Sequence, residues 1–212
     1  MPLETQDPAS QSFSFTTTKT LINAPGSLES IASHCKALGV TRPMVVTDQG
    51  IVSVGLLDQL SEALSKDGEN NELAISIYAD VIADPPEDIV LSALAQAKTH
   101  KADGIIGYGG GSSMDTAKVI ALLACSGESL VDIYGVEQAK GPRLPLILIP
   151  TTAGTGSEVT AVAIITTGET TKSGIVSPIL LPDIALLDAK LTTGLPAHVT
   201  AATGIDAMVH AI

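Results

Sequence analysis

The sequence predicts an α/β fold: a Rossmann-like, mainly parallel sheet with flanking helices, followed by the start of an all-helical second domain. Short apolar runs such as residues 43–48 have the continuous hydrophobicity of strands buried on both faces of a parallel sheet. Helix-like amphipathic segments alternate with these runs, and that alternation requires crossover connections. From Leu195 onward the chain becomes rich in Ala and Thr and has a helical pattern only. We therefore expect domains at residues 1–194 and 195–212.

The elements are expected in the following order. Alternating polar and apolar residues at 13–16 predict an exposed or edge strand, and Pro25-Gly26 predicts a turn before a helix at 27–38. The alternation then continues with strand 43–48, helix 51–66, strand 73–78, helix 87–99, strand 104–108, helix 113–124 and strand 144–149. Two further strands are expected at 161–166 and 184–188, with a turn at 168–172 between them.

Composition and charge exclude several classes of partner. The 212 residues are 45% hydrophobic and 16% charged, which is typical of a globular chain. A net charge of −12 repels phosphate backbones and anionic lipids, so we expect neither nucleic acid nor membrane as a partner. With 2 Phe, 3 Tyr and no Trp there is no platform for stacking bases. No segment approaches the ~18 uninterrupted apolar residues of a membrane span.

The cysteines and the first residues of the chain favour a cytoplasmic location. Cys35 and Cys125 lie far apart in helix-like segments, without a Cys-x-x-Cys motif, and we expect both to be reduced core thiols. The first twelve residues are polar and lack the apolar run of a signal peptide.

The segment GGGSSMD at 109–115 directly follows a predicted buried strand and opens a helix. Glycines there allow a phosphate to approach the backbone closely, and the free N–H groups of a helix N-terminus bind anions. The alternative is a tight turn in which Ser112 is the N-cap and Asp115 its capping-box partner. Both interpretations can hold together, and the segment matches neither G-x-G-x-x-G nor the Walker A pattern.

Asp48 ends the first predicted buried strand. In open α/β sheets ligands bind beyond the carboxyl ends of strands, where an acidic residue can bond a ribose 2′-hydroxyl and repel a 2′-phosphate. This placement favours NAD over NADP. The alternative is an aspartate that caps the helix beginning near Ile51.

The loop PTTAGTGSEVT at 150–160 follows another buried strand and combines small hydroxylated residues with two glycines. Such a loop is dense in hydrogen-bond donors and suits close contact with a nucleotide. By composition alone, a surface turn explains it equally well.

Asp206 and His210 are four residues apart on a predicted helix, so they share one face and can both reach one divalent ion. The alternative is an aspartate near a helix start, capped by Thr203, with a histidine packed one turn later. Two ligands do not complete a metal site, because catalytic metals usually take three or more from the protein.

In this order, the segments resemble those of the iron-containing alcohol dehydrogenase family. The resemblance rests on VVTD at 45–48, GGGSSMDTAK at 109–118, PTTAGTGSEVT at 150–160, LLPDIALLD at 180–188 and TGIDAMVHAI at 203–212. It extends from about residue 16 to the last residue. Two positions differ from the family pattern: Ala24 replaces a glycine, and Asp84 stands before Pro85 where the family often has Asn. We do not expect Asp84 to contact phosphate directly, because its charge would oppose binding.

The resemblance implies that residues 1–194 bind a dinucleotide and that residues 195–212 begin a truncated helical metal-binding domain. It also implies a role for individual residues. Asp48 would face the adenosine ribose; Gly110, Gly111 and Ser112 would hold the pyrophosphate, with Asp115 close by; Thr151, Thr152 and Thr155 would line the nucleotide; Lys172 would reach the cofactor ribose; and Asp206 and His210 would be two of four metal ligands. Fe²⁺ is the expected metal, with Zn²⁺ or Mn²⁺ as alternatives.

The implied function is hydride transfer between NAD and a primary alcohol or aldehyde at a divalent metal. We expect the 212-residue chain alone to be an incomplete, weakly active or inactive fragment. Two alternatives are a non-catalytic dinucleotide-binding module and a relative of glycerol dehydrogenase or dehydroquinate synthase within the same superfamily. The polar strand near 13–17 could pair across a two-fold axis and form a homodimer.

Overall fold

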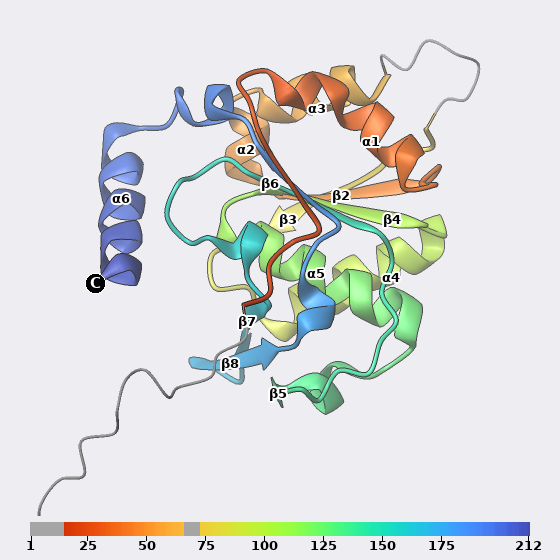
Figure 1. Ribbon diagram of the computed structural model, residues 1–212. Coiled ribbons are helices and arrows are strands. Elements are labelled where there is room, and N and C mark those ends of the chain that lie inside the picture. Colours follow the sequence, from red (N-terminus) through yellow and green to blue (C-terminus); the bar gives the residue numbers. More distant parts are fainter. Residues whose placement is uncertain (1–14, 66–72) are drawn as a thin grey trace, which may run out of the picture.

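The structure is a computed structural model that describes residues 15–65 and 73–212 (Figure 1). The strands are β1 (Thr20–Asn23), β2 (Pro43–Asp48), β3 (Ser76–Val81), β4 (Gly104–Gly109), β5 (Gly135–Val136), β6 (Leu146–Pro150), β7 (Val162–Thr167), β8 (Thr171–Val176) and β9 (Ile184–Leu187). The α-helices are α1 (Ile31–Ala37), α2 (Gln49–Ser53), α3 (Leu56–Ser65), α4 (Glu87–His100), α5 (Gly111–Ser126) and α6 (Ala197–Ala211). Short 3-10 turns are η2 (Ser27–Ser30), η3 (Leu130–Ile133), η4 (Ser157–Val159), η5 (Pro178–Leu180) and η6 (Ala189–Thr192).

A six-stranded sheet in the order β1-β9-β6-β4-β2-β3 forms the centre of the molecule, and all of its neighbouring strands run parallel. Every residue of β4 and β6 is buried, because helices cover both faces of the sheet. This arrangement confirms the predicted α/β class and explains the continuous apolar runs in the sequence.

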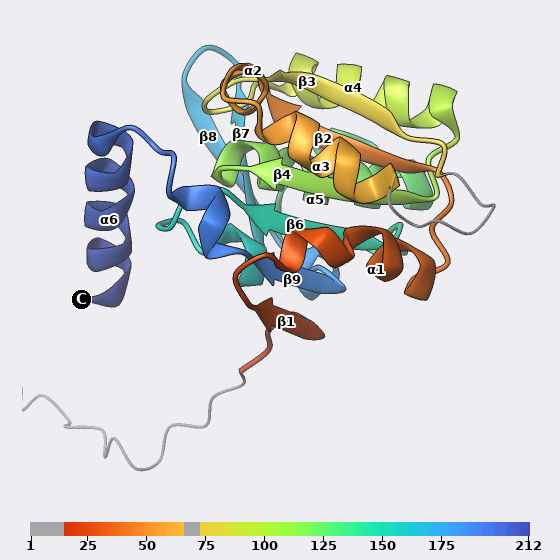
Figure 2. The ribbon, with the colours of Figure 1, turned by 90° about the horizontal axis from the view of Figure 1, so that it is seen from above.

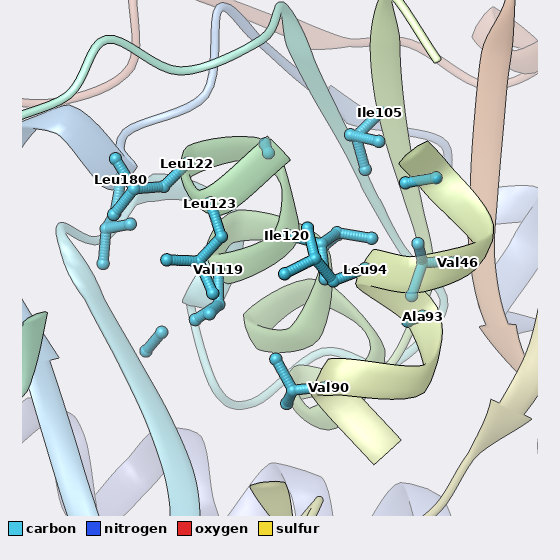
Figure 3. Packing of buried hydrophobic residues seen from close by; sticks show 14 of the residues in the cluster. Val46, Val90, Ala93, Leu94, Ile105, Val119, Ile120, Leu122, Leu123 and Leu180 are labelled. Carbon is cyan, nitrogen blue, oxygen red and sulfur yellow. The ribbon is translucent and has the colours of Figure 1, made fainter. Parts of the chain in front are cut away.

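The core is divided between the two faces of the sheet. α1 and α3 contribute to the cluster on one face, and α4 and α5 to the cluster on the other, as Figure 1 shows. Figure 3 shows the second cluster, where Val90 and Leu94 of α4 lie beside Ile120 of α5. The carboxyl ends of the central strands are therefore fixed by helices packed on both faces of the sheet.

Three elements differ from the prediction. Residues 168–172 were expected to form a turn, but Lys172 lies in β8, which pairs antiparallel with β7 in a second sheet ordered β5-β8-β7. The helix expected at 51–66 is broken into α2 and α3 at Gly55, whose φ of +74° requires the left-handed region. Residues 13 and 14 of the first expected strand lie outside the described ranges; residues 15 and 16 are not in a strand, and β1 begins at Thr20.

Cys125 also differs from the prediction. Cys35 is buried in the core, and burial raises the pKa of its thiol to about 12, but Cys125 is exposed near the end of α5. The helix pattern around Cys125 predicted its secondary structure but not the face on which it lies. Among the helices placed by the structure, none is long and apolar enough to cross a membrane.

α6 stands to the side of the α/β layers in both views (Figures 1 and 2). None of its residues is buried. It approaches the loop after β6, where a Cβ atom added to Gly154 would lie only 2.6 Å from the carbonyl oxygen of Thr203. The glycine therefore allows the loop and the helix to meet closely.

Candidate functional site

The carboxyl ends of β2, β4 and β6 meet at one edge of the sheet, because the three strands are parallel. Gly109 pairs with Pro150 at the ends of β4 and β6, and Thr151 N–H donates to the carbonyl oxygen of Gly109 over 3.0 Å. The three predicted nucleotide motifs therefore come together although they are far apart in the sequence. This edge is where ligands bind in open α/β sheets.

The N-terminus of α5 has no side-chain cap. Gly110 occupies the N-cap position without a capping hydrogen bond, and the helix begins at Gly111. The capping box predicted for Ser112 and Asp115 is therefore wrong. The first N–H groups of a helix have no acceptor inside the helix, so here the N–H groups and the positive end of the helix dipole are available to an anion.

Gly111 allows the threonine loop, residues 150–160, to approach this helix end closely. A Cβ atom on Gly111 would lie 3.0 Å from Thr155 Cγ2, which is a tight contact, whereas one on Gly110 would lie at an ordinary contact distance of 3.6 Å from Thr152 Oγ1. Thr151 lies deeper: it is buried, and its hydroxyl has no hydrogen-bond partner within the described part of the chain. A backbone cradle that a side chain would fill, together with an unpaired buried hydroxyl beside it, suits a phosphate-bearing ligand.

Asp115 and Lys118 form a buried polar network behind this cradle. The Lys118 ammonium is fully buried and donates to Ser157 Oγ over 2.8 Å and to the carbonyl oxygen of Val162 over 2.6 Å. The Asp115 carboxylate accepts from Ser157 Oγ and from the N–H of Ile164. Burial lowers the pKa of Lys118 and outweighs the opposite effect of Asp115.

The network therefore joins α5 to η4 and β7, and Asp115 serves first to position the threonine loop. The sequence prediction did not include this role. The signal that could have indicated it is a lysine three residues after Asp115, within a helix that is otherwise apolar around it.

Asp48 caps the helix that follows it. Its Oδ1 accepts from the N–H of Ile51 over 3.1 Å, and its Oδ2 accepts from Ser113 Oγ over 3.1 Å. The capping interpretation is confirmed. A carboxylate has about four acceptor positions, so these two bonds leave capacity for ribose hydroxyls, and the ribose role stays a prediction.

A cavity of about 720 Å³ opens beside the cradle. It brings together residues predicted from separate motifs: Gly111, Ser112, Asp115, Thr155, Lys172, Asp206 and His210. Asp48, Gly110, Thr151 and Thr152 are not part of its lining. The volume falls within the range that is typical of small-molecule and cofactor sites.

The predicted metal pair lies on α6 at the rim of this cavity. His210 Nε2 is 3.8 Å from Asp206 Oδ1, and both side chains are about half exposed. Within residues 15–65 and 73–212, no three His, Cys, Asp or Glu side chains are grouped in a way that could hold a metal ion. The pair supplies two donors of suitable type, but it does not make a complete site.

Comparison with known proteins agrees with this geometry. The family model for iron-containing alcohol dehydrogenase matches residues 18–189. The chain belongs to this family. Its resemblance to the iron-containing alcohol dehydrogenases, inferred from the motifs, is thereby confirmed.

The relatives show how much of a family member this chain covers. It is 41% identical over 190 residues to long-chain-alcohol dehydrogenase 1 of Geobacillus thermodenitrificans, covering 88% of this chain and 47% of that protein. A crystal structure of 1,3-propanediol oxidoreductase matches with a TM-score of 0.88 and 32% identity, over 95% of this chain and 52% of the other. Sulfoacetaldehyde reductase from Bifidobacterium kashiwanohense, solved in complex with NAD+, matches with a TM-score of 0.83 and 29% identity, over 93% and 51% of the two chains. The chain thus spans about half the length of these iron-containing alcohol dehydrogenase relatives.

Proposed function

We propose that this chain is the NAD-binding half of an iron-containing alcohol dehydrogenase, which transfers hydride between NAD and a primary alcohol or aldehyde at a divalent metal. One observation carries the proposal: a single cavity joins the uncapped N-terminus of α5 to the Asp206 and His210 pair on α6. A phosphate site and a metal half-site that face the same cavity are the two parts that such a reaction requires.

Each part of the cradle has a specific task in this proposal. The backbone N–H groups of Gly111 and Ser112, with Gly110, bind the pyrophosphate at the positive end of the α5 dipole. Thr152 and Thr155 close over the nucleotide from the opposite loop, and Asp48 binds the adenosine ribose. The buried network of Asp115 and Lys118 keeps the two loops at a fixed separation.

The metal site is only partly supplied by this chain. A carboxylate and an imidazole suit Fe²⁺, and also Zn²⁺ or Mn²⁺, and a divalent cation supplies Lewis-acid polarisation of an oxygen substrate. Asp206 and His210 leave the coordination incomplete. We therefore propose that the isolated chain binds the cofactor and has little or no dehydrogenase activity.

The substrate is proposed only as a class. The names of the relatives include a long-chain alcohol, 1,3-propanediol and sulfoacetaldehyde, which differ in length and charge. They share a hydroxyl or carbonyl group on a small molecule, and this shared group supports an alcohol or aldehyde as substrate. A cytoplasmic location and a homodimer formed through the segment near residues 13–17 stay predictions.

A non-catalytic dinucleotide-binding module is the second candidate. It is favoured by one observation, the two-donor metal pair on a helix with no buried residue. The match to the family model for the iron-containing enzymes speaks against the glycerol dehydrogenase and dehydroquinate synthase alternatives. The two candidates are separated by assaying a metal-loaded form of the protein in which further residues complete the metal coordination. Oxidation of an alcohol by that form would identify an enzyme, and no oxidation would favour a binding module.

The first test is a fluorescence titration of the 212-residue chain with NADH and, separately, with NADPH. We expect NADH to bind about tenfold more tightly, because the Asp48 carboxylate repels a 2′-phosphate. Asp48→Ser keeps an N-cap for Ile51 and removes the charge, so it should narrow the preference for NADH.

The matched control is Asp58→Asn, which removes one charge from an exposed position on α3 and should leave both affinities unchanged. Failure of the wild-type chain to bind either nucleotide would refute the proposed function. An unchanged preference in Asp48→Ser would refute the role of Asp48 alone.

A further inference from the structure

Asp84 and Lys172 form an ion pair at the cavity. Lys172 Nζ lies 2.7 Å from Asp84 Oδ1, and both side chains are about half exposed. Asp84 belongs to the loop between β3 and α4, and Lys172 to β8, so the pair joins elements that are far apart in the sequence. Both residues line the cavity that contains Gly111 and the metal pair.

The backbone on both sides of this pair is fixed by one residue, Thr166 of β7. Its hydroxyl donates to the carbonyl oxygen of Asp84 over 2.9 Å, and its N–H donates to the carbonyl oxygen of Pro85 over 2.9 Å. Thr166 also pairs directly with Lys172 in the β7–β8 ladder. The backbone positions of Asp84 and Lys172 are therefore fixed relative to each other, and this placement brings the two side chains within bonding distance.

The pair also changes the charge that a dinucleotide would meet. An unpaired carboxylate in this cavity would repel the cofactor phosphates, but the Lys172 ammonium balances it at 2.7 Å. An ammonium has three donor hydrogens, so Lys172 can bond Asp84 and still donate to a ligand. Lys172 lines the same cavity as Asp206 and His210, whereas Asp48 does not, so Lys172 faces the metal side of the site.

We infer that Asp84 is a positioning residue, which holds the Lys172 ammonium in place to bind the ribose at the nicotinamide end of the cofactor. The inference rests on the proposed function, since it assumes that NAD is the ligand.

The test is a double-mutant cycle on nucleotide affinity. Asp84 has a φ of +52°, so we choose Asp84→Asn and Asp84→Gly, which both tolerate this conformation. Asn keeps the shape and removes the charge, and Gly also removes the acceptor. Each substitution is made in the wild-type chain and in Lys172→Met, and the Kd of NADH and of ADP is measured by calorimetry.

We expect NADH to bind about twofold more weakly to Asp84→Asn and about fivefold more weakly to Asp84→Gly, which is the size of effect typical of a half-exposed ion pair. In the Lys172→Met background neither substitution should weaken binding further, because the group that Asp84 positions is gone. The affinity for ADP should stay unchanged throughout, because ADP lacks the nicotinamide ribose. Asp58→Asn is again the charge-matched control, on the opposite face of the sheet.

Three results would overturn the inference while NADH still binds to the wild-type chain. Tighter NADH binding by Asp84→Asn would mean that the carboxylate acts by repulsion. If the Asp84 substitutions weakened NADH binding equally in the wild-type and Lys172→Met backgrounds, Asp84 would only maintain the loop. The same would hold if they weakened ADP binding as much as NADH binding. A wild-type chain that binds neither NADH nor ADP would overturn the proposed function and this inference together. Thermal unfolding of each variant identifies any loss of fold, and Asp84→Asn keeps the test decisive if Asp84→Gly unfolds.

Discussion

The two walls of the cavity are built in different ways. The nucleotide wall, where we propose that the cofactor binds, rests on α5, in which Lys118 is completely buried and bonded to two neighbouring segments. The metal wall, where we propose that the metal binds, is α6, which has no buried residue and leaves Ile205, Met208 and Val209 61–65% exposed. An isolated helix of this length is marginal in water, because most helical stability in proteins comes from packing. The geometry of the nucleotide wall is thus set by the core of this chain, whereas that of the metal wall is not.

The largest effect is expected from Lys118→Met, which removes the cation at the centre of the nucleotide wall. The substitution removes the hydrogen bonds that the Lys118 ammonium donates to Ser157 Oγ and to the carbonyl oxygen of Val162. It also removes the positive charge beside the Asp115 carboxylate, which keeps its bonds from Ser157 Oγ and the N–H of Ile164. Breaking a buried charged network in this way costs about 3 kcal/mol of unfolding free energy. We expect urea denaturation to show this loss and the NADH titration to show loss of binding.

Lys98→Met is the matched control, because Lys98 is exposed in the last turn of α4 and its loss should cost less than about 0.5 kcal/mol. If Lys118→Met were as stable as this control, the buried network would not be what holds the nucleotide wall. The contrast between the two walls would then need another cause.

A smaller effect is expected at Asp183, which supports the nucleotide wall from the amino end of the sheet. Burial alone would raise the pKa of Asp183, but hydrogen bonds from Arg143, Lys19 and the N–H of Leu146 outweigh it and lower the pKa to about 2. A lowered pKa means that the charged carboxylate stabilises the fold above its unfolded pKa of about 3.9, and that this stability is lost as the pH falls toward 2. Asp183→Asn should therefore lose about 2 kcal/mol at pH 7 and show a flatter decline between pH 5 and pH 2.

Unfolding curves at several pH values measure both quantities. Asp132→Asn serves as a control at an exposed position of η3, where the aspartate accepts only a local hydrogen bond, from the hydroxyl of Ser129. An Asp183→Asn chain that keeps the wild-type pH dependence would contradict the assignment. Hydrogen exchange in α6 should change only as much as the global stability changes, because α6 meets the loop after β6 at the carboxyl end of the sheet.

The same contrast explains what the sequence could and could not predict. β4 and β6 are buried on both faces, so their apolar runs are continuous, and the loops that follow them could be placed at one edge of the sheet. β8 begins with exposed polar residues and has no such pattern, so it was expected to be partly a turn. For Asp115 the sequence predicted a place close to the pyrophosphate and, as an alternative, a local capping box. Its actual partners, Ser157 and Ile164, could not be predicted because they lie more than forty residues away. Interactions between distant segments leave no periodic signal, and the ion pair between Asp84 and Lys172 is of that kind.

The smallest effect is expected where the two walls touch, at Gly154 and Thr203. A Cβ atom in Gly154→Ala would lie 2.6 Å from a backbone oxygen of α6, so the loop and the helix must separate. Gly204→Ala is the matched substitution inside α6: nothing lies within 4 Å of its Cβ position, and alanine should stabilise the helix by about 0.5–1 kcal/mol. We expect amide hydrogen exchange in α6 to become faster in Gly154→Ala and about threefold slower in Gly204→Ala, while exchange in β4 and β6 stays unchanged in both. If exchange in the central strands changed together with that in α6, the two walls would unfold as one unit, and the metal wall would depend on the core of this chain after all.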